Sequence, residues 1–236
     1  MNMLPKIDTP TFTLVVPSTQ KKVKYRPYVV KEEKILLMAA ESKSEADIID
    51  AMKRLITNCT FDALTIDDLT MYDLEYIFLQ LRIKSVGETS TIQLKCTEGH
   101  ATPVDVDLDK VELFWQDDEH ATEKTIMLDK NLGVKLSHIP ATTTETLQNQ
   151  VNAADQIVNL IGACIKEVFN ADNVWTKADF SEDDIAEFVE QFTNKQLDAI
   201  QQFILSQPIL KETVKWTCPT CKKESSFEVK GLQNFF

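Results

Sequence analysis

Residues 10–30 alternate between apolar and polar positions, and a polar interruption falls at residues 17–20. The run at 11–16 is rich in β-branched residues, and an extended pattern resumes at 22–28 after the turn-forming letters PSTQ. Pro27 disfavours a helical conformation at the residue before it. The pattern therefore predicts a β-hairpin at the start of the chain.

The apolar period then changes from two residues to that of a helix. We expect helices over residues 31–42, from the cap Ser44 to about residue 58, and over 70–86 between the cap Thr70 and the stop signal Gly87. The apolar faces that support the first and third helices are Ile35, Leu36, Ala39 and Ala40, and Leu74, Ile77, Phe78 and Leu81.

Two segments far apart in the chain share the pattern strand, turn, strand. Residues 90–96 and 101–109 alternate around a turn at 97–100, and residues 210–218 and 224–230 do the same around CPTC. Between them, the pattern predicts an irregular stretch at 112–124 and a second hairpin at 125–140, with its turn near 131–133.

The C-terminal third is predicted to be helical. Residues 145–169 read as one long amphipathic helix, and a second helix begins at the cap Ser181. A third begins with Thr193 and Gln196 at capping-box spacing and stops at Pro208.

These elements predict an α+β protein with an N-terminal hairpin and helices over residues 1–90. Residues 91–108 and 211–230 come together as split zinc-ribbon-like β-knuckles, within a module of residues 91–110 and 211–236. An inserted hairpin and helical subdomain would occupy residues 111–210.

Composition narrows the class of protein. The chain has 236 residues, 43% of them hydrophobic, and a net charge of −12. No stretch is as long and apolar as a membrane span, and the N-terminus lacks the pattern of a signal peptide, so we expect a soluble protein made in a cytoplasm. Its acidity disfavours nucleic acid as a partner, because phosphate backbones would be repelled.

The cysteines supply the candidate chemistry. Cys218 and Cys221 form a Cys-x2-Cys pair on one turn, and Cys96 and His100 lie on the other turn of the same design. Three thiols and an imidazole are a full tetrahedral ligand set for zinc. The spacing therefore predicts one structural zinc ion, with the two halves of its site 118 residues apart between His100 and Cys218.

A redox pair, a disulfide or catalytic zinc fits the thiols less well. A redox pair needs a helix after its Cys-x-x-C, whereas a strand is predicted there, and a reducing compartment disfavours a disulfide. Four protein ligands leave no open position for catalytic zinc. Thiols that bind no metal remain an alternative. Glu98 or His120 could also replace His100 as the fourth ligand, because a Cys-x3-His turn constrains its ligands less than a Cys-x2-Cys turn does.

The remaining candidates favour structural roles. Cys59 and Cys164 lie among apolar residues of predicted helices, so we expect both to be buried. His138 has no evident partner in the sequence, and we expect a structural role for it. Phe235 and Phe236 end the chain and would be buried either in this domain or by a partner protein. No phosphate-binding loop or hydrolase motif is present, which favours a protein without enzymatic activity.

Residues 10–110 resemble the baseplate hub proteins of T4-like contractile-tailed bacteriophages. The resemblance is carried by the run YRPYVVKEEKILLMAAES, by the lone Cys59, by DLEYIFLQLRIKSVGE and by TIQLKC. It implies a non-enzymatic component or assembly factor of the central hub, located in the virion tail baseplate after synthesis in the bacterial cytoplasm.

The resemblance also implies the partners, which would be other hub and tail proteins, with tape-measure or tube-initiation proteins as further candidates. It contributes no catalytic residues, and the zinc prediction comes from the cysteine spacing alone. A zinc-ribbon module for nucleic-acid binding or transcription is the alternative function, and a cryptic hydrolase would need an open metal position.

Overall fold

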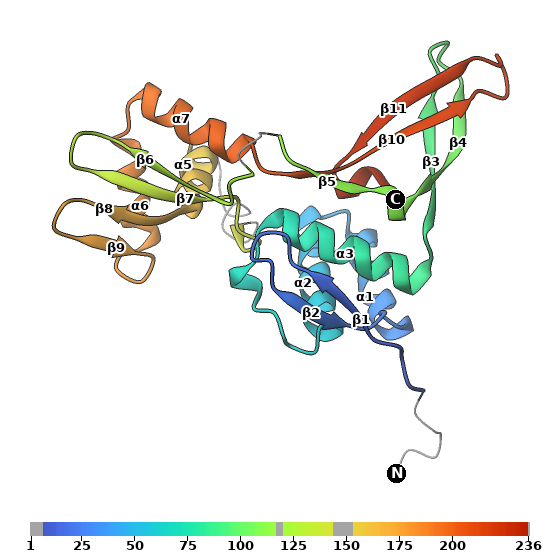
Figure 1. The fold of residues 1–236 in the computed structure, drawn as a ribbon, viewed down its shortest axis with the longest axis horizontal. Coiled ribbons are helices and arrows are strands. Elements are labelled where there is room, and N and C mark those ends of the chain that lie inside the picture. Colours follow the sequence, from blue (N-terminus) through green and yellow to red (C-terminus); the bar gives the residue numbers. More distant parts are fainter. Residues whose placement is uncertain (1–6, 117–119, 144–152, 236) are drawn as a thin grey trace. The chain divides into compact units, whose positions relative to one another are not determined.

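The computed structural model describes residues 7–116, 120–143 and 153–235 and confirms the α+β class (Figure 1). The chain forms two compact units, which we treat separately. The first contains residues up to 65, residues 73–114 and residues from 209 onward, and the second contains 66–72 and 115–208. The division into residues 1–90, 111–210 and a split module stays a prediction.

The first unit begins with the predicted hairpin, in which β1 (Phe12–Val15) pairs antiparallel with β2 (Lys22–Tyr25). Three helices follow it, and the predicted positions of all three are confirmed. They are α1 (Val30–Ser42), α2 (Glu45–Cys59) and α3 (Met71–Val86). The Ser44 hydroxyl accepts a hydrogen bond from the Asp47 N–H, as a helix N-cap does.

The third helix is enclosed on more than one side, because Leu79 and Ile83 are buried as well as the predicted Leu74, Ile77 and Leu81. The first helix differs from its prediction. Only Glu32 and Ala39 are buried along its length, whereas Ile35 and Ala40 are exposed. The carboxylate of Glu32 thus lies on the buried face, where the apolar period predicted Ile35.

Glu32 is buried because it is fully engaged. Its carboxylate accepts hydrogen bonds from Arg26 Nη2 at 3.0 Å and from the Val29 N–H at 2.9 Å. Burial alone would raise the pKa of Glu32, but the hydrogen bonds from Arg26 and Val29 outweigh it and hold this pKa below its usual value. The YRPYVVKEE run therefore joins the hairpin to the start of α1 through one ion pair.

Two further hairpins complete the first unit. Strands β3 (Thr89–Lys95) and β4 (Ala101–Asp107) pair antiparallel, and β10 (Ile209–Thr217) pairs with β11 (Glu224–Lys230). A short β5 (Glu112–Phe114) adds to β10, so the prediction of an irregular stretch there was wrong at these residues. Short 3-10 turns follow β4 and β11, at η2 (Leu108–Lys110) and η3 (Leu232–Phe235).

The second unit contains an antiparallel sheet of four strands in the order β6-β7-β8-β9. The strands are β6 (Glu123–Met127), β7 (Gly133–Ser137), β8 (Ile165–Phe169) and β9 (Val174–Thr176). The predicted hairpin at 125–140 is confirmed as β6 and β7. The predicted helix at 145–169 is confirmed only as α5 (Ala153–Cys164), and its residues 145–152 lie outside the described residues.

From Ile165 the chain is a strand, so the helix prediction was wrong for residues 165–169. The segment IKEVF lies between β7 and β9 and pairs with both. Helices α6 (Glu182–Glu190) and α7 (Asn194–Leu205) follow, with the predicted cap at Ser181 and the predicted capping box of Thr193 with Gln196. Asp184 completes a capping box at Ser181 as well. A short η1 (Ile66–Asp68) belongs to this unit as well.

The core of the second unit lies between its sheet and its helices. Its buried side chains come from β7, β8, α5, α6 and α7, and they are Val134, Leu136, Ile161, Cys164, Ile165, Val168, Val189, Ile200, Phe203 and Ile204. His138 adds an aromatic ring to this interior, stacked on Phe203 with the ring centroids 4.6 Å apart.

Candidate metal centre

The turn of the β3–β4 hairpin presents Cys96 and His100. The Cys96 N–H donates to the His100 carbonyl at 3.1 Å, and the Gly99 N–H donates to the Cys96 carbonyl at 2.8 Å. Gly99 has a φ of 83°, in the left-handed region that glycine tolerates best. This tight closure directs both side chains to the same side of the turn.

The turn of the β10–β11 hairpin is built in a similar way. The Cys218 N–H donates to the Lys223 carbonyl at 2.9 Å, and the Lys222 N–H donates back to the Cys218 carbonyl at 2.9 Å. Cys218 and Cys221 therefore project from one closed loop.

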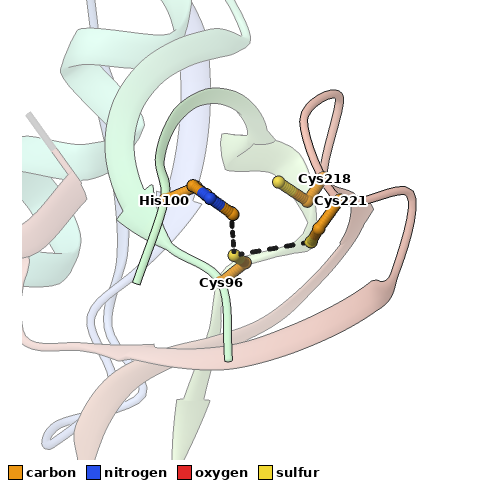
Figure 2. Close-up of side chains that lie close together, drawn as sticks. All are labelled: Cys96, His100, Cys218 and Cys221. Carbon is orange, nitrogen blue, oxygen red and sulfur yellow. Dashed lines mark hydrogen bonds between the residues drawn. The ribbon is translucent and has the colours of Figure 1, made fainter. Parts of the chain in front are cut away.

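The four side chains meet in one cluster, the Cys3His cluster (Cys96, His100, Cys218 and Cys221). Figure 2 shows them pointing toward one another from the two hairpins. Their donor atoms all lie within 4.8 Å of one another. Cys96 Sγ is 3.5 Å from His100 Nδ1 and 3.9 Å from Cys221 Sγ. The two turns that were predicted to meet, 118 residues apart in the sequence, thus lie together in the structure.

These distances fit a tetrahedral ion of the size of zinc. Zn–S bonds of about 2.3 Å and Zn–N bonds of about 2.0–2.1 Å separate two sulfurs by about 3.8 Å and a sulfur from a nitrogen by about 3.6 Å. The distances of 3.9 Å and 3.5 Å in the cluster match these two values. The set is therefore compatible with a zinc site in size, in ligand chemistry and in ligand number.

The electrostatics favour one ionised thiol before any metal is considered. Hydrogen bonds from the Cys221 and Thr220 N–H groups and from the neighbouring thiols outweigh desolvation and lower the pKa of Cys218 to about 6. By contrast, burial raises the pKa of Cys59 to about 11 and that of Cys164 to about 12. At Cys221 the hydrogen bond from the Lys223 N–H lowers the pKa, but desolvation and the neighbouring Cys218 and Cys96 raise this pKa overall. Cys218 is therefore the thiol of the cluster that is prepared to ionise.

Two further contacts join the hairpins next to the Cys3His cluster. The Thr102 hydroxyl, on β4, is 3.9 Å from Cys218 Sγ and is buried. Lys223 Nζ donates to Glu98 Oε1 at 2.5 Å across the two turns. Sequence reasoning missed both contacts, although it named Glu98 as an alternative ligand. A signal for Thr102 exists in the alternation of β4, which places Thr102 on the same face as Val104 and Val106.

The structure also places the alternative ligands. Glu98 pairs with Lys223, and His120 stacks on Trp115 in the second unit with centroids 5.1 Å apart. Neither belongs to the cluster, whereas His100 does.

The other candidates have structural surroundings. Cys59 and Cys164 are buried, as expected, and His138 is buried too. Phe235 is fully buried, and Phe236 lies outside the described residues.

The second unit contains a cavity of about 250 Å³. Lys177 lines it, and burial lowers the pKa of this lysine, but its ammonium group donates to the Ala163 carbonyl at 2.8 Å. No histidine or cysteine is among the described residues around this cavity.

An α+β protein with a closed four-ligand cluster and an acidic surface has the features of a structural and interaction module. Residues 9–236 match the family described as T4 bacteriophage base plate protein, so the chain belongs to this family. Membership indicates a structural component of a phage baseplate, located in the virion tail among other tail proteins. It also favours a non-enzymatic role.

Comparison with curated proteins and with solved structures found no match. Among the described residues, no helix combines the length and the apolar character that crossing a membrane requires.

Proposed function

We propose that this protein is a component or assembly factor of the central hub of a contractile-tail baseplate and that it acts through protein–protein contacts. The family match across residues 9–236 carries the proposal. The resemblance of the YRPYVVKEEK and DLEYIFLQLR segments to hub proteins supports the hub as the location. The partners would be other hub and tail proteins.

The Cys3His cluster holds one structural zinc ion in this proposal, with Cys96, His100, Cys218 and Cys221 as its ligands. The match of the donor distances to a zinc tetrahedron supports it. When bound, zinc would supply a crosslink between hairpins that are far apart in sequence. With four protein ligands, the site would have no position for substrate or activated water.

Tails purified from infected cells test the location. The expected result is that the protein co-purifies with hub proteins at a fixed low copy number, and crosslinking with mass spectrometry should join it to them. Recovery with hub intermediates but not with finished tails would identify an assembly factor, which is within the proposal. Recovery with neither would overturn it.

The alternative function, a zinc-ribbon module for nucleic acid, makes an opposite prediction. Such a protein would bind DNA or RNA with an affinity that falls steeply as salt rises. With a net charge of −12, we expect no such binding by the purified protein.

A further inference from the structure

Helix α1 exposes an apolar face that the first unit does not cover. Val30, Leu37 and Met38 are 65%, 59% and 71% exposed. At 100° per residue, Val30 and Leu37 lie almost above one another, and Met38 lies beside Leu37. The helix therefore exposes three large apolar side chains, with Val30 and Leu37 along one line, the stripe, and Met38 about 100° further round the helix.

The exposure follows from how the helix is anchored. Glu32 is 1% exposed and bound to Arg26, and Ala39 is the other buried residue of the helix. These two residues lie on the side opposite to Val30 and Leu37. A buried ion pair therefore fixes the rotation of α1 about its axis, so its apolar stripe is a permanent feature of the surface.

Two opposite charges lie between the directions of Leu37 and Met38 around the helix. Lys34 lies one turn before Leu37, and Glu41 lies one turn after it, both exposed and on the same face. Neither forms an ion pair with another of the described residues. A parallel second copy of the helix would place like charges together, whereas an antiparallel copy would place unlike charges together.

We propose that this face of α1 binds a second copy of the same chain, with the two helices antiparallel. A two-fold axis at the level between Leu37 and Met38 would pack Leu37 of each copy on Leu37 of the other, and Met38 on Met38. The same axis would set Lys34 of each copy against Glu41 of the other, because both pairs of residue numbers have the same midpoint. Such self-complementarity is the requirement for an isologous dimer.

The interface would be small. A helix of 13 residues is about 20 Å long, so the area it can bury falls at the low end for specific complexes. We therefore expect a reversible dimer with a dissociation constant on the order of 10–100 µM.

Sedimentation equilibrium of the full chain from about 1 µM to about 500 µM tests the dimer. Leu37→Glu and Met38→Glu should each weaken dimerisation at least about tenfold, because each places a charge in the apolar centre. Leu205→Glu is a matched control, since Leu205 is a comparably exposed leucine at the end of another helix. All three positions are exposed, so circular dichroism should show unchanged folding.

Charge reversal tests the orientation. Lys34→Glu or Glu41→Lys alone should weaken the dimer, because each creates like-charge pairs, and the double variant should restore it. A chain that is monomeric at every concentration overturns the proposal, as does a double variant that stays weak. A monomeric chain that loses a tail-protein partner through Leu37→Glu would also overturn it and assign the face to that partner. None of these outcomes depends on the hub assignment.

Discussion

Two regions of this protein hold their β-strands together in different ways. In the first unit, the β3–β4 hairpin and the β10–β11 hairpin belong to separate sheets, and a cluster of ligand side chains brings their turns together. In the second unit, the four strands β6 to β9 form one sheet and share a core with three helices. One region has a cluster of ligand side chains between its two hairpins, and the other has a continuous apolar interior.

The difference shows where stability comes from in each region. An isolated two-stranded hairpin is marginally stable, because it has too little apolar surface to offset the entropy of ordering its strands. The β3–β4 hairpin buries only alternate residues on one face. A bound ion at the turns would supply the missing free energy. The sheet of the second unit has no such need, because its core residues are buried against helices.

Removal of a ligand should therefore have the largest effect, and only in the first unit. Cys218→Ser should abolish stoichiometric zinc in the purified protein and free the two turns. Structural zinc stabilises its fold by on the order of 10 kcal/mol, so amide exchange in β3, β4, β10 and β11 should rise sharply. Amide exchange in β6 to β9 should not change.

Cys164→Ala is the control for this experiment, because it removes a buried thiol outside the Cys3His cluster. It should keep one zinc ion per chain. Wild-type protein that purifies under reducing conditions without zinc, and folds as well as the Cys218→Ser variant, would contradict the metal proposal.

Substitution of a core residue should instead affect only the second unit. Phe203 is buried in its core and stacks on His138, so Phe203→Ala should lower the free energy of unfolding of that unit by about 3–5 kcal/mol. Denaturant unfolding measures the loss, and zinc content should stay at the wild-type value. Leu205→Ala, on the exposed end of the same helix, should have little effect. A loss of zinc in Phe203→Ala would show that the two regions are coupled.

The elements that could be predicted from the sequence depend on local chemistry. The caps at Ser181 and Thr193 are determined by residues three positions away, and the structure confirms both. The Cys3His cluster could also be predicted, because two turns with the same design and complementary ligands have few ways to satisfy a tetrahedron.

The elements that were missed depend on partners far away in the chain. The apolar period of α5 continues into residues 165–169, and only pairing with β7 makes this segment a strand. Glu32 has the local pattern of a surface residue, and its burial depends on Arg26 at the end of the preceding hairpin. Thr102 gains its role from a thiol 116 residues further along the chain.

The contact between α3 and η3 in the first unit provides a test of stability that is independent of the metal. Glu75, on α3, accepts a hydrogen bond from the Leu232 N–H of η3, and burial, partly opposed by this bond, raises the pKa of Glu75 to about 7 from its ordinary 4.5. The folded state therefore binds this proton more tightly than the unfolded state does. Its contribution to stability is fully present below pH 4.5 and is lost as the pH rises to about 7.

Glu75→Gln should remove this dependence, because an amide stays neutral and can still accept the hydrogen bond. At pH 8 we expect the variant to be more stable than wild type by on the order of 3 kcal/mol, with the difference vanishing near pH 4. Urea unfolding at several pH values measures it. Glu224→Gln, at an exposed position of β11, should leave the pH profile unchanged. An unchanged profile in Glu75→Gln would contradict the assignment.

The smallest expected effect concerns Thr102. It tests whether residues other than the four ligands contribute to the proposed zinc crosslink. The buried hydroxyl of Thr102 comes from one hairpin and faces the Cys218 sulfur of the other at 3.9 Å. When Cys218 is a thiolate, only the hydroxyl can donate, so its role would be to orient the ligand and stabilise its charge. Thr102→Val keeps the shape and removes the donor.

We expect Thr102→Val to weaken zinc binding about tenfold in competition with a chelator, which is the lower end for loss of a ligand's hydrogen-bond partner. Cobalt substitution should show a shifted thiolate charge-transfer band, a readout that a change in folding stability alone would not produce. Thr213→Val, on the outward face of β10, should change neither. Equal zinc affinity in Thr102→Val and wild type would confine the crosslink to its four ligands. A weakened affinity would instead show that strand β4, and not only the turn before it, contributes to holding the hairpins together.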